Sequence, residues 1–83
     1  MLFEVKITID LKPTVNNPEG LTIKSSLENL GFSNLNSVRV GKNIVIKIDS
    51  ANKDEVISQV EEMCNKLLSN PIIEQYEFEI NQI

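Results

Sequence analysis

The sequence predicts an α+β fold in which an antiparallel sheet carries two helices on one face. Residues 3–12 alternate strictly between apolar and polar side chains, which is the period of a half-buried strand. Two later segments, 17–31 and 52–70, each carry a single apolar stripe at helical spacing. A second alternating segment, 72–80, lies near the end of the chain. Because each helix has one stripe and the outer strands have one apolar face, both helices are expected on the same side of the sheet.

The first helix is predicted between two marked ends. Asn17 is a suitable N-cap, and Pro18 fits the first helical position. Gly31 suits the left-handed conformation that ends many helices. The apolar stripe between these ends consists of Ile23, Leu27 and Leu30. Pro13, which has no N–H to donate to a sheet, separates this helix from the first strand.

Two short strands are predicted after the first helix, at Asn36–Val40 and Ile44–Asp49. The residues between them, 41–43, read Gly-Lys-Asn, and both Gly and Asn tolerate the positive φ angles of tight hairpins. The second of these strands alternates isoleucine with other residues at Ile44, Ile46 and Ile48. A hairpin is therefore expected in the middle of the chain.

The second helix is predicted to begin at Asn52, with Glu55 placed to complete a capping box, and to stop before Pro71. Its apolar stripe consists of Val56, Val60, Met63 and Leu67. The last strand presents one apolar face, made of Ile72, Tyr76, Phe78 and Ile80. The complete order, βαββαβ, is that of a ferredoxin-like two-layer sandwich, and residues 1–83 are expected to form one domain.

Composition excludes several kinds of protein. The net charge of −4 argues against nucleic acid as the main partner, because phosphate binding needs clustered cations. No stretch approaches the roughly 20 apolar residues that span a bilayer, and the first residues lack a signal-peptide core. A cytoplasmic protein without membrane contact is therefore expected. A domain this small buries only about 60% of its unfolded surface, so self-association is the expected additional source of stability.

The side chains offer little chemistry. The chain contains no histidine and one cysteine, Cys64, so no metal site is expected. Cys64 has no imidazole base, and its place in the second helix favours a small core residue. No glycine-rich phosphate loop is present, so the chain is expected to bind no ATP or other cofactor and to have no catalytic residue.

Arg39 is the only arginine of the chain and lies beside Gly41 and Lys42. In one interpretation, its guanidinium is an anchor for a carboxylate on another subunit. In the other, it is a solvent-facing strand residue, and Lys42 only contributes to solubility. The sequence leaves both interpretations open, and we take Arg39, Gly41 and Lys42 as candidate residues of a subunit interface.

Three blocks of the chain, in their order and spacing, carry a resemblance to a known family. The blocks are residues 11–20 (LKPTVNNPEG), 38–42 (VRVGK) and 64–80 (CNKLLSNPIIEQYEFEI). They resemble PurS, the small subunit of bacterial and archaeal phosphoribosylformylglycinamidine (FGAM) synthase, an enzyme of purine biosynthesis. The resemblance implies a PurS-like fold and a dimer or tetramer that bridges a glutaminase subunit and an ATP-dependent synthetase subunit and assists ammonia transfer. It also implies that the active sites, ATP and magnesium belong to those other subunits of the ligase complex.

Two other classes share the predicted topology. Acylphosphatases need an arginine in the loop after the first strand, and that loop, residues 12–16, contains none. Regulatory modules of the ACT type bind small molecules at a glycine-bearing turn after the first strand. Here this turn carries Pro13 and Pro18, with Gly20 late. The ACT-like module remains the alternative prediction.

Overall fold

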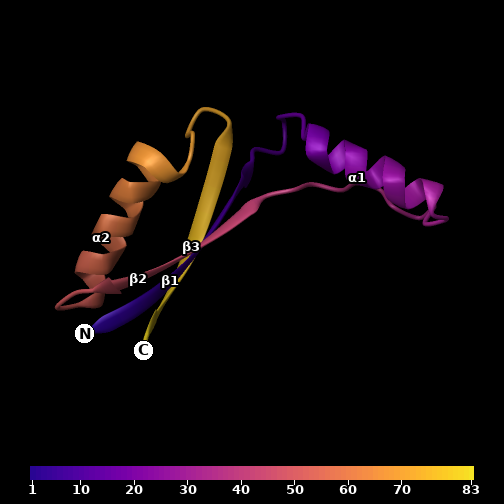
Figure 1. Cartoon of the computed structure of the whole chain (residues 1–83). Coiled ribbons are helices and arrows are strands. Elements are labelled where there is room, and N and C mark those ends of the chain that lie inside the picture. The colour runs from indigo at the N-terminus through magenta and orange to yellow at the C-terminus, as the bar shows by residue number, and fades with distance from the viewer.

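A central strand, β1 (Leu2–Leu11), organises a three-stranded antiparallel sheet. The structure is a computed structural model that describes residues 1–83. On one side β1 pairs with β2 (Lys42–Asp49), and on the other side it pairs with β3 (Glu74–Gln82), which gives the strand order β2-β1-β3 (Figure 1). The predicted α+β class with an antiparallel sheet is confirmed.

The alternation of β1 places its apolar residues on one face of the sheet. Val5 lies between Ile46 of β2 and Ile80 of β3 in the register of the sheet. The buried apolar core consists of Phe3, Val5, Ile7, Ile9, Val56, Val60 and Cys64. Tyr76 and Phe78 pack against this core from β3, as predicted. Helix α2 (Lys53–Met63) supplies two of the core valines and covers this face (Figure 1).

The apolar stripe of the second helix shifts by one residue at its C-terminal end. After α2 the chain widens into a π-helical turn, η1 (Cys64–Leu68). The predicted stripe continued through Met63 and Leu67, but Leu67 is 82% exposed. Cys64 is buried and Leu68 packs against the core instead. A π turn contains more residues than an α turn, so steps of four residues stay on one face and the stripe follows Val60, Cys64 and Leu68.

The chain turns sharply between η1 and β3, which changes the predicted start of the last strand. The N–H groups of Ile73 and Glu74 both donate to the Asn70 carbonyl, at 3.1 and 2.7 Å. The Asn70 side chain also accepts a hydrogen bond from the Ile72 N–H at 3.1 Å. Ile72, predicted on the apolar face of the strand, therefore lies in the turn and is 80% exposed.

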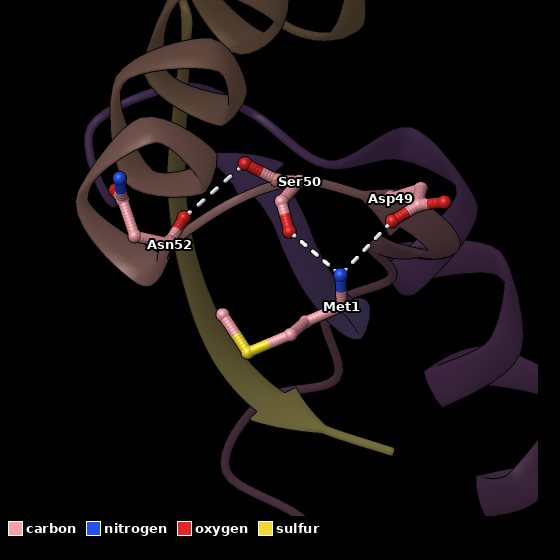
Figure 2. A network of polar contacts seen from close by, with 4 residues as sticks. All are labelled: Met1, Asp49, Ser50 and Asn52. Carbon is pink, nitrogen blue, oxygen red and sulfur yellow. Dashed lines mark hydrogen bonds and ion pairs between the residues drawn. The ribbon is translucent and has the colours of Figure 1, made fainter.

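A polar network joins β1, β2 and α2 at one end of the sheet (Figure 2). The Met1 amino group donates to the Asp49 carboxylate at 3.1 Å and to the Ser50 carbonyl at 2.9 Å. The Ser50 hydroxyl donates to the Asn52 carbonyl at 3.2 Å. The Asn52 side chain accepts from the Glu55 N–H at 2.8 Å, which confirms Asn52 as the N-cap of α2. The reciprocal bond from the Glu55 side chain is absent, so the capping box is incomplete.

Three predictions about the first half of the chain are wrong. Helix α1 (Pro18–Asn29) does not cover the sheet but stands clear of it, beyond the end of β1 (Figure 1). The segment Asn36–Val40 does not form a strand; it runs back from α1 in an extended course without strand partners. Gly41 makes no hairpin turn, since Gly31 is the only residue with a positive φ. A period-two pattern predicts an extended segment but does not say what pairs with it.

The separation of α1 from the sheet gives the molecule an elongated shape. Its radius of gyration is 16.5 Å and its longest dimension is 51 Å. A compact domain of this length has a radius of gyration of about 12 Å. The accessible surface is 5809 Å², against about 5,000 Å² for a compact monomer of this mass. A considerable part of the chain therefore lies outside any intrachain core.

Candidate functional site

We call residues 13–41 the arm and the rest of the chain the body. The arm contains α1, the extended segment that follows it, and the loop that precedes it. No buried apolar residue of the chain belongs to the arm. Its exposed large apolar side chains are Leu21, Ile23, Leu30 and Phe32, which are 55%, 38%, 74% and 55% exposed. The apolar stripe that the sequence predicts is present on α1, but this chain alone does not cover it.

Both ends of α1 are closed by local hydrogen bonds. Asn17 accepts from the Gly20 N–H at 2.9 Å through its side-chain oxygen, as predicted for an N-cap. At the other end Gly31 has a φ of 104°, and the Phe32 N–H donates to the Leu27 carbonyl at 3.1 Å. This is a Schellman ending, so the prediction for Gly31 is confirmed. The helix is thus specified locally although its apolar side chains face solvent.

Residues 33–41 make no backbone–backbone hydrogen bonds. Such a segment exposes a row of donors and acceptors that a strand of another chain can pair with. The segment includes Val38 and Val40, which the sequence predicts on a strand. The predicted strand Asn36–Val40 is therefore not formed within this chain, because no strand of the same chain pairs with it.

The arm joins the body at what we call the root, formed by residues 11–20 and 38–41. Asn17 is 5% exposed and lies at its centre. The side-chain amide nitrogen of Asn17 donates to the Val40 carbonyl at 3.0 Å. Gly20 packs so closely that an added Cβ would lie 2.1 Å from the Val38 carbonyl oxygen. The first turn of α1 is therefore pressed against the returning segment.

Arg39 connects the returning segment to the loop after β1. Its Nη2 group donates to the Val15 carbonyl at 2.9 Å, the Lys12 carbonyl at 3.1 Å and the Leu11 carbonyl at 3.5 Å. A guanidinium offers several donors in a fixed plane, which suits such a group of carbonyl oxygens. Arg39 is an exposed residue, and its Nε and Nη1 groups donate to no acceptor in this chain.

Gly41 and Lys42 complete the connection to the sheet. A Cβ at Gly41 would lie 2.8 Å from the Ile9 carbonyl oxygen and 3.1 Å from the Asp10 Cβ, so Gly41 permits a close backbone approach to β1. The Lys42 ammonium lies 3.9 Å from the Glu74 carboxylate of β3. This pair is partly exposed and long, and it contributes little to stability.

The structure thus gathers the three predicted interface residues, Arg39, Gly41 and Lys42, at one short segment of the root. Their contact with a neighbouring subunit stays a prediction. Sequence reasoning treated Asn17 only as a helix cap and Gly20 only as a late glycine after the first strand. The presence of a glycine in the first turn of the predicted helix was the available signal, because a residue that disfavours helices often marks a close backbone approach.

The single thiol of the chain lies outside the arm. Cys64 is fully buried, and burial raises the pKa of its thiol above the ordinary value of 9.0. No three His, Cys, Asp or Glu side chains gather where they could hold a metal ion. Neither α1 nor α2 has the length and apolar character needed to cross a membrane.

Comparisons with known proteins identify the family. The family model described as "PurS: Phosphoribosylformylglycinamidine (FGAM) synthase" matches residues 4–82. The chain is 43% identical over 82 residues to phosphoribosylformylglycinamidine synthase subunit PurS of Methanocaldococcus jannaschii, covering 99% of both chains. It is 32% identical over 82 residues to the PurS subunit of Bacillus subtilis, covering 99% of this chain and 96% of the relative.

Solved structures agree with the sequence comparison. The crystal structure of Methanocaldococcus jannaschii PurS superposes with a TM-score of 0.87 at 44% identity, covering 98% of both chains. A chain in the structure of PurLQS from Thermotoga maritima gives a TM-score of 0.89 at 30% identity, covering 98% of this chain and 99% of that chain. The matches span arm and body together. The chain therefore belongs to the PurS family of phosphoribosylformylglycinamidine synthase subunits.

Proposed function

We propose that this chain is the non-catalytic small subunit of phosphoribosylformylglycinamidine synthase in purine biosynthesis. As a dimer it bridges the glutaminase subunit and the ATP-dependent synthetase subunit and helps to enclose the path of ammonia. The observation that carries this proposal is the arm, which holds apolar side chains and unpaired backbone away from the body of the same chain. A chain built in this way requires another chain to complete its packing.

We propose that a second copy of this chain covers the exposed apolar side chains of the arm. Full burial of one Leu, Ile or Phe side chain contributes about 1.5–3 kcal/mol, and the arm exposes four such residues. Backbone pairing of residues 33–41 with a strand of the other copy would add hydrogen bonds worth about 1 kcal/mol each. In a twofold dimer each copy gives one arm and receives one, so every such contact forms twice.

The bridging role is supported by the likeness to the chain from Thermotoga maritima PurLQS, which covers 98% of this chain. In the proposed complex, the synthetase subunit holds ATP and magnesium, the glutaminase subunit releases ammonia from glutamine, and this chain binds no cofactor. No observation favours the alternative of an ACT-like regulatory module. Gly20, the late glycine of the relevant turn, packs directly against the Val38 carbonyl of the same chain.

We also propose that Arg39 and Lys42 contact a neighbouring subunit. The Nε and Nη1 groups of Arg39 have no acceptor in this chain and suit a carboxylate on that subunit, because a guanidinium presents paired donors. Arg39→Ala should weaken dimer formation or complex assembly, measured by sedimentation velocity, whereas Arg39→Lys should retain part of the binding. Unchanged dimerisation and assembly in Arg39→Ala would exclude this role.

The decisive test is amide transfer by the synthetase and glutaminase of the same organism, with and without this chain. Glutamine and free ammonium salt are compared as nitrogen donors. We expect the chain to restore the glutamine-dependent rate and to change the ammonium-dependent rate little, since its role is to couple the two enzymes. No effect on either rate would contradict the proposed function.

A matched pair of variants links this activity to the arm. Leu30→Ser alters a side chain that is 74% exposed on the arm, and Leu67→Ser alters one that is 82% exposed on the body. Both substitutions introduce the same chemical change at an exposed site. Leu30→Ser should lower the glutamine-dependent rate, whereas Leu67→Ser should not. Equal glutamine-dependent rates for both variants would contradict a role of the arm in this activity.

A further inference from the structure

We propose that Asn17, acting with Gly20 and Arg39, is a positioning residue that holds the arm in one direction relative to the sheet before a second copy binds. The inference rests on the proposed dimerisation through the arm and concerns what prepares the arm for it. The root fixes the arm by directed contacts, whereas the rest of the arm has no packing that would do so.

The first step is the way the chain passes through the root. The chain leaves the body after β1 and returns to it before β2, so two segments connect arm and body (Figure 1). Two backbone connections alone would allow the arm to swing. The returning segment, however, lies between the first turn of α1 and the end of β1. Gly20 packs against it at Val38, and Gly41 brings it close to the Ile9 carbonyl.

The second step is the double use of Asn17. Its oxygen accepts from the Gly20 N–H at 2.9 Å, and its nitrogen donates to the Val40 carbonyl at 3.0 Å. One amide therefore fixes both the start of α1 and the returning segment. With Asn17 only 5% exposed, water cannot readily replace these bonds. Loss of one bond leaves a buried polar group without a partner, which shifts a conformational equilibrium by about tenfold.

The third step is the contribution of Arg39. Its Nη2 group holds the Lys12 and Val15 carbonyls, which belong to the turn between β1 and α1. That turn is closed by a bond from the Val15 N–H to the Lys12 carbonyl at 2.9 Å. Arg39 thereby ties the returning segment to the outgoing one. Together with Asn17 it leaves neither segment free to rotate independently of the other.

The affinity of the dimer depends on the fraction of chains whose arm already points in the direction that the partner needs. A partner binds only arms that point in the correct direction, so the apparent dissociation constant rises as that fraction falls. An arm fixed in advance also avoids the entropy cost of ordering it on binding. A root variant that retains the folded body should therefore weaken the dimer, by about tenfold when the correct direction becomes one of ten.

The test uses Asn17→Asp with Asn52→Asp as its control. Aspartate retains the oxygen that caps a helix but loses the N–H₂ donor. Asn17→Asp therefore keeps the cap of α1 and removes the bond to Val40. Asn52 caps α2 in the same manner, and its side-chain amide donates to no acceptor in this chain. Asn52→Asp has the same charge change at a helix start and leaves the root intact.

Arm direction is measured in single molecules by energy transfer between dyes on Cys introduced at Ser33 in the arm and Asn81 in the body, with Cys64→Ala. Picomolar concentration keeps the chains separate. We expect one narrow efficiency distribution for the parent chain and for Asn52→Asp, and a shifted or broadened one for Asn17→Asp. Amide exchange in β1 should stay the same in all three, because a defect in overall folding would change it.

The dimer dissociation constant is measured by sedimentation equilibrium on the unlabelled chains. An increase of about tenfold for Asn17→Asp and none for Asn52→Asp supports the proposal. A narrow, unshifted distribution for Asn17→Asp overturns it, and so does a parent chain whose distribution is already broad. A parent chain that never dimerises contradicts the proposed function instead, and the energy-transfer result then decides the positioning role alone.

Discussion

The arm and the body each contain one capped, amphipathic helix of similar length, yet the two helices have different fates. Helix α2, with 11 residues, buries Val56 and Val60 in the core. Helix α1, with 12 residues, buries only Gly20. Local signals specify both helices equally well. What differs is the connection to the sheet, because the root holds the start of α1 beyond the end of β1.

This difference separates two uses of apolar side chains. In the body they stabilise the fold of one chain, and in the arm they are available to another chain. Most changes in the arm should therefore leave the body folded. Few of these changes should leave assembly with another chain intact. The first two changes described below compare the body with the arm, the third compares two sites within the arm, and the last concerns the body alone.

Removal of a whole element should give the largest effect. Truncation after Asn70 deletes β3 and with it Tyr76, Phe78 and Ile80, which pack against the core. β1 would also lose its pairing with β3 along its whole length. We expect no cooperative thermal transition by circular dichroism. Replacement of residues 13–40 by a short Asn-Gly turn should instead leave a cooperative transition, since β1 and β2 are antiparallel neighbours. A cooperative melt of the chain truncated after Asn70 would contradict the division of the molecule into a body that depends on β3 and a separate arm.

Single apolar substitutions should separate the regions next. Ile7 is fully buried, so Ile7→Ala should lower the free energy of unfolding by about 2–5 kcal/mol. Leu30 is 74% exposed, so Leu30→Ala should change that free energy by less than about 0.5 kcal/mol in the monomer. Urea titration at low protein concentration measures both. A large effect of Leu30→Ala in the monomer would show that the arm packs on its own body.

Two glycines of the arm should differ in a smaller but clear way. An added Cβ at Gly20 would lie 2.1 Å from the Val38 carbonyl oxygen. Gly20→Ala should therefore displace the returning segment and speed amide exchange at the start of α1. Gly31 has open space around it but a φ of 104°, so Gly31→Ala should cost about 1 kcal/mol through backbone strain and fray only the end of the helix. Equal exchange profiles of the two variants would contradict the close packing of the root.

The smallest effect concerns pH and belongs to the body alone. Burial raises the pKa of the Cys64 thiol in the folded chain above its ordinary value of 9.0. Above that pH the unfolded chain loses the proton first, so stability falls as pH rises, by at most about 1.4 kcal/mol per pH unit. Stability contributed by the protonated thiol is fully present at neutral pH. The difference in urea midpoint between the parent and Cys64→Ala should therefore be constant at neutral pH and change above pH 9.0. A constant difference throughout would exclude the burial effect.

The sequence was sufficient for the elements whose signals are local. The alternation of β1, the caps Asn17 and Asn52, and the helix ending at Gly31 are all found as predicted. Each depends on residues close in sequence, so propensity and hydrogen-bonding chemistry decide the outcome. Family membership was also within reach, because three blocks in fixed order resemble PurS.

The features that sequence reasoning missed depend on contacts between distant residues. The sequence of residues 36–40 predicts a strand, but only the course of the chain shows that no neighbouring strand is available. The shift from Leu67 to Leu68 follows from a π turn, for which the sequence carries no pattern. The role of Asn17 in the root needs the Val40 carbonyl, which lies far along the chain.

Because α1 is long, a small rotation at the root gives a large displacement at the far end of the helix. Its 12 residues extend for about 18 Å at 1.5 Å per residue. A rotation of about ten degrees at the root would then move the far end of the helix by about 3 Å, comparable with a hydrogen-bond length. The position of any surface at the far end of α1 therefore depends on a few atoms around Asn17, which lie far from that surface. Mutational drift at the root would misalign a distant interface without altering a single residue in it.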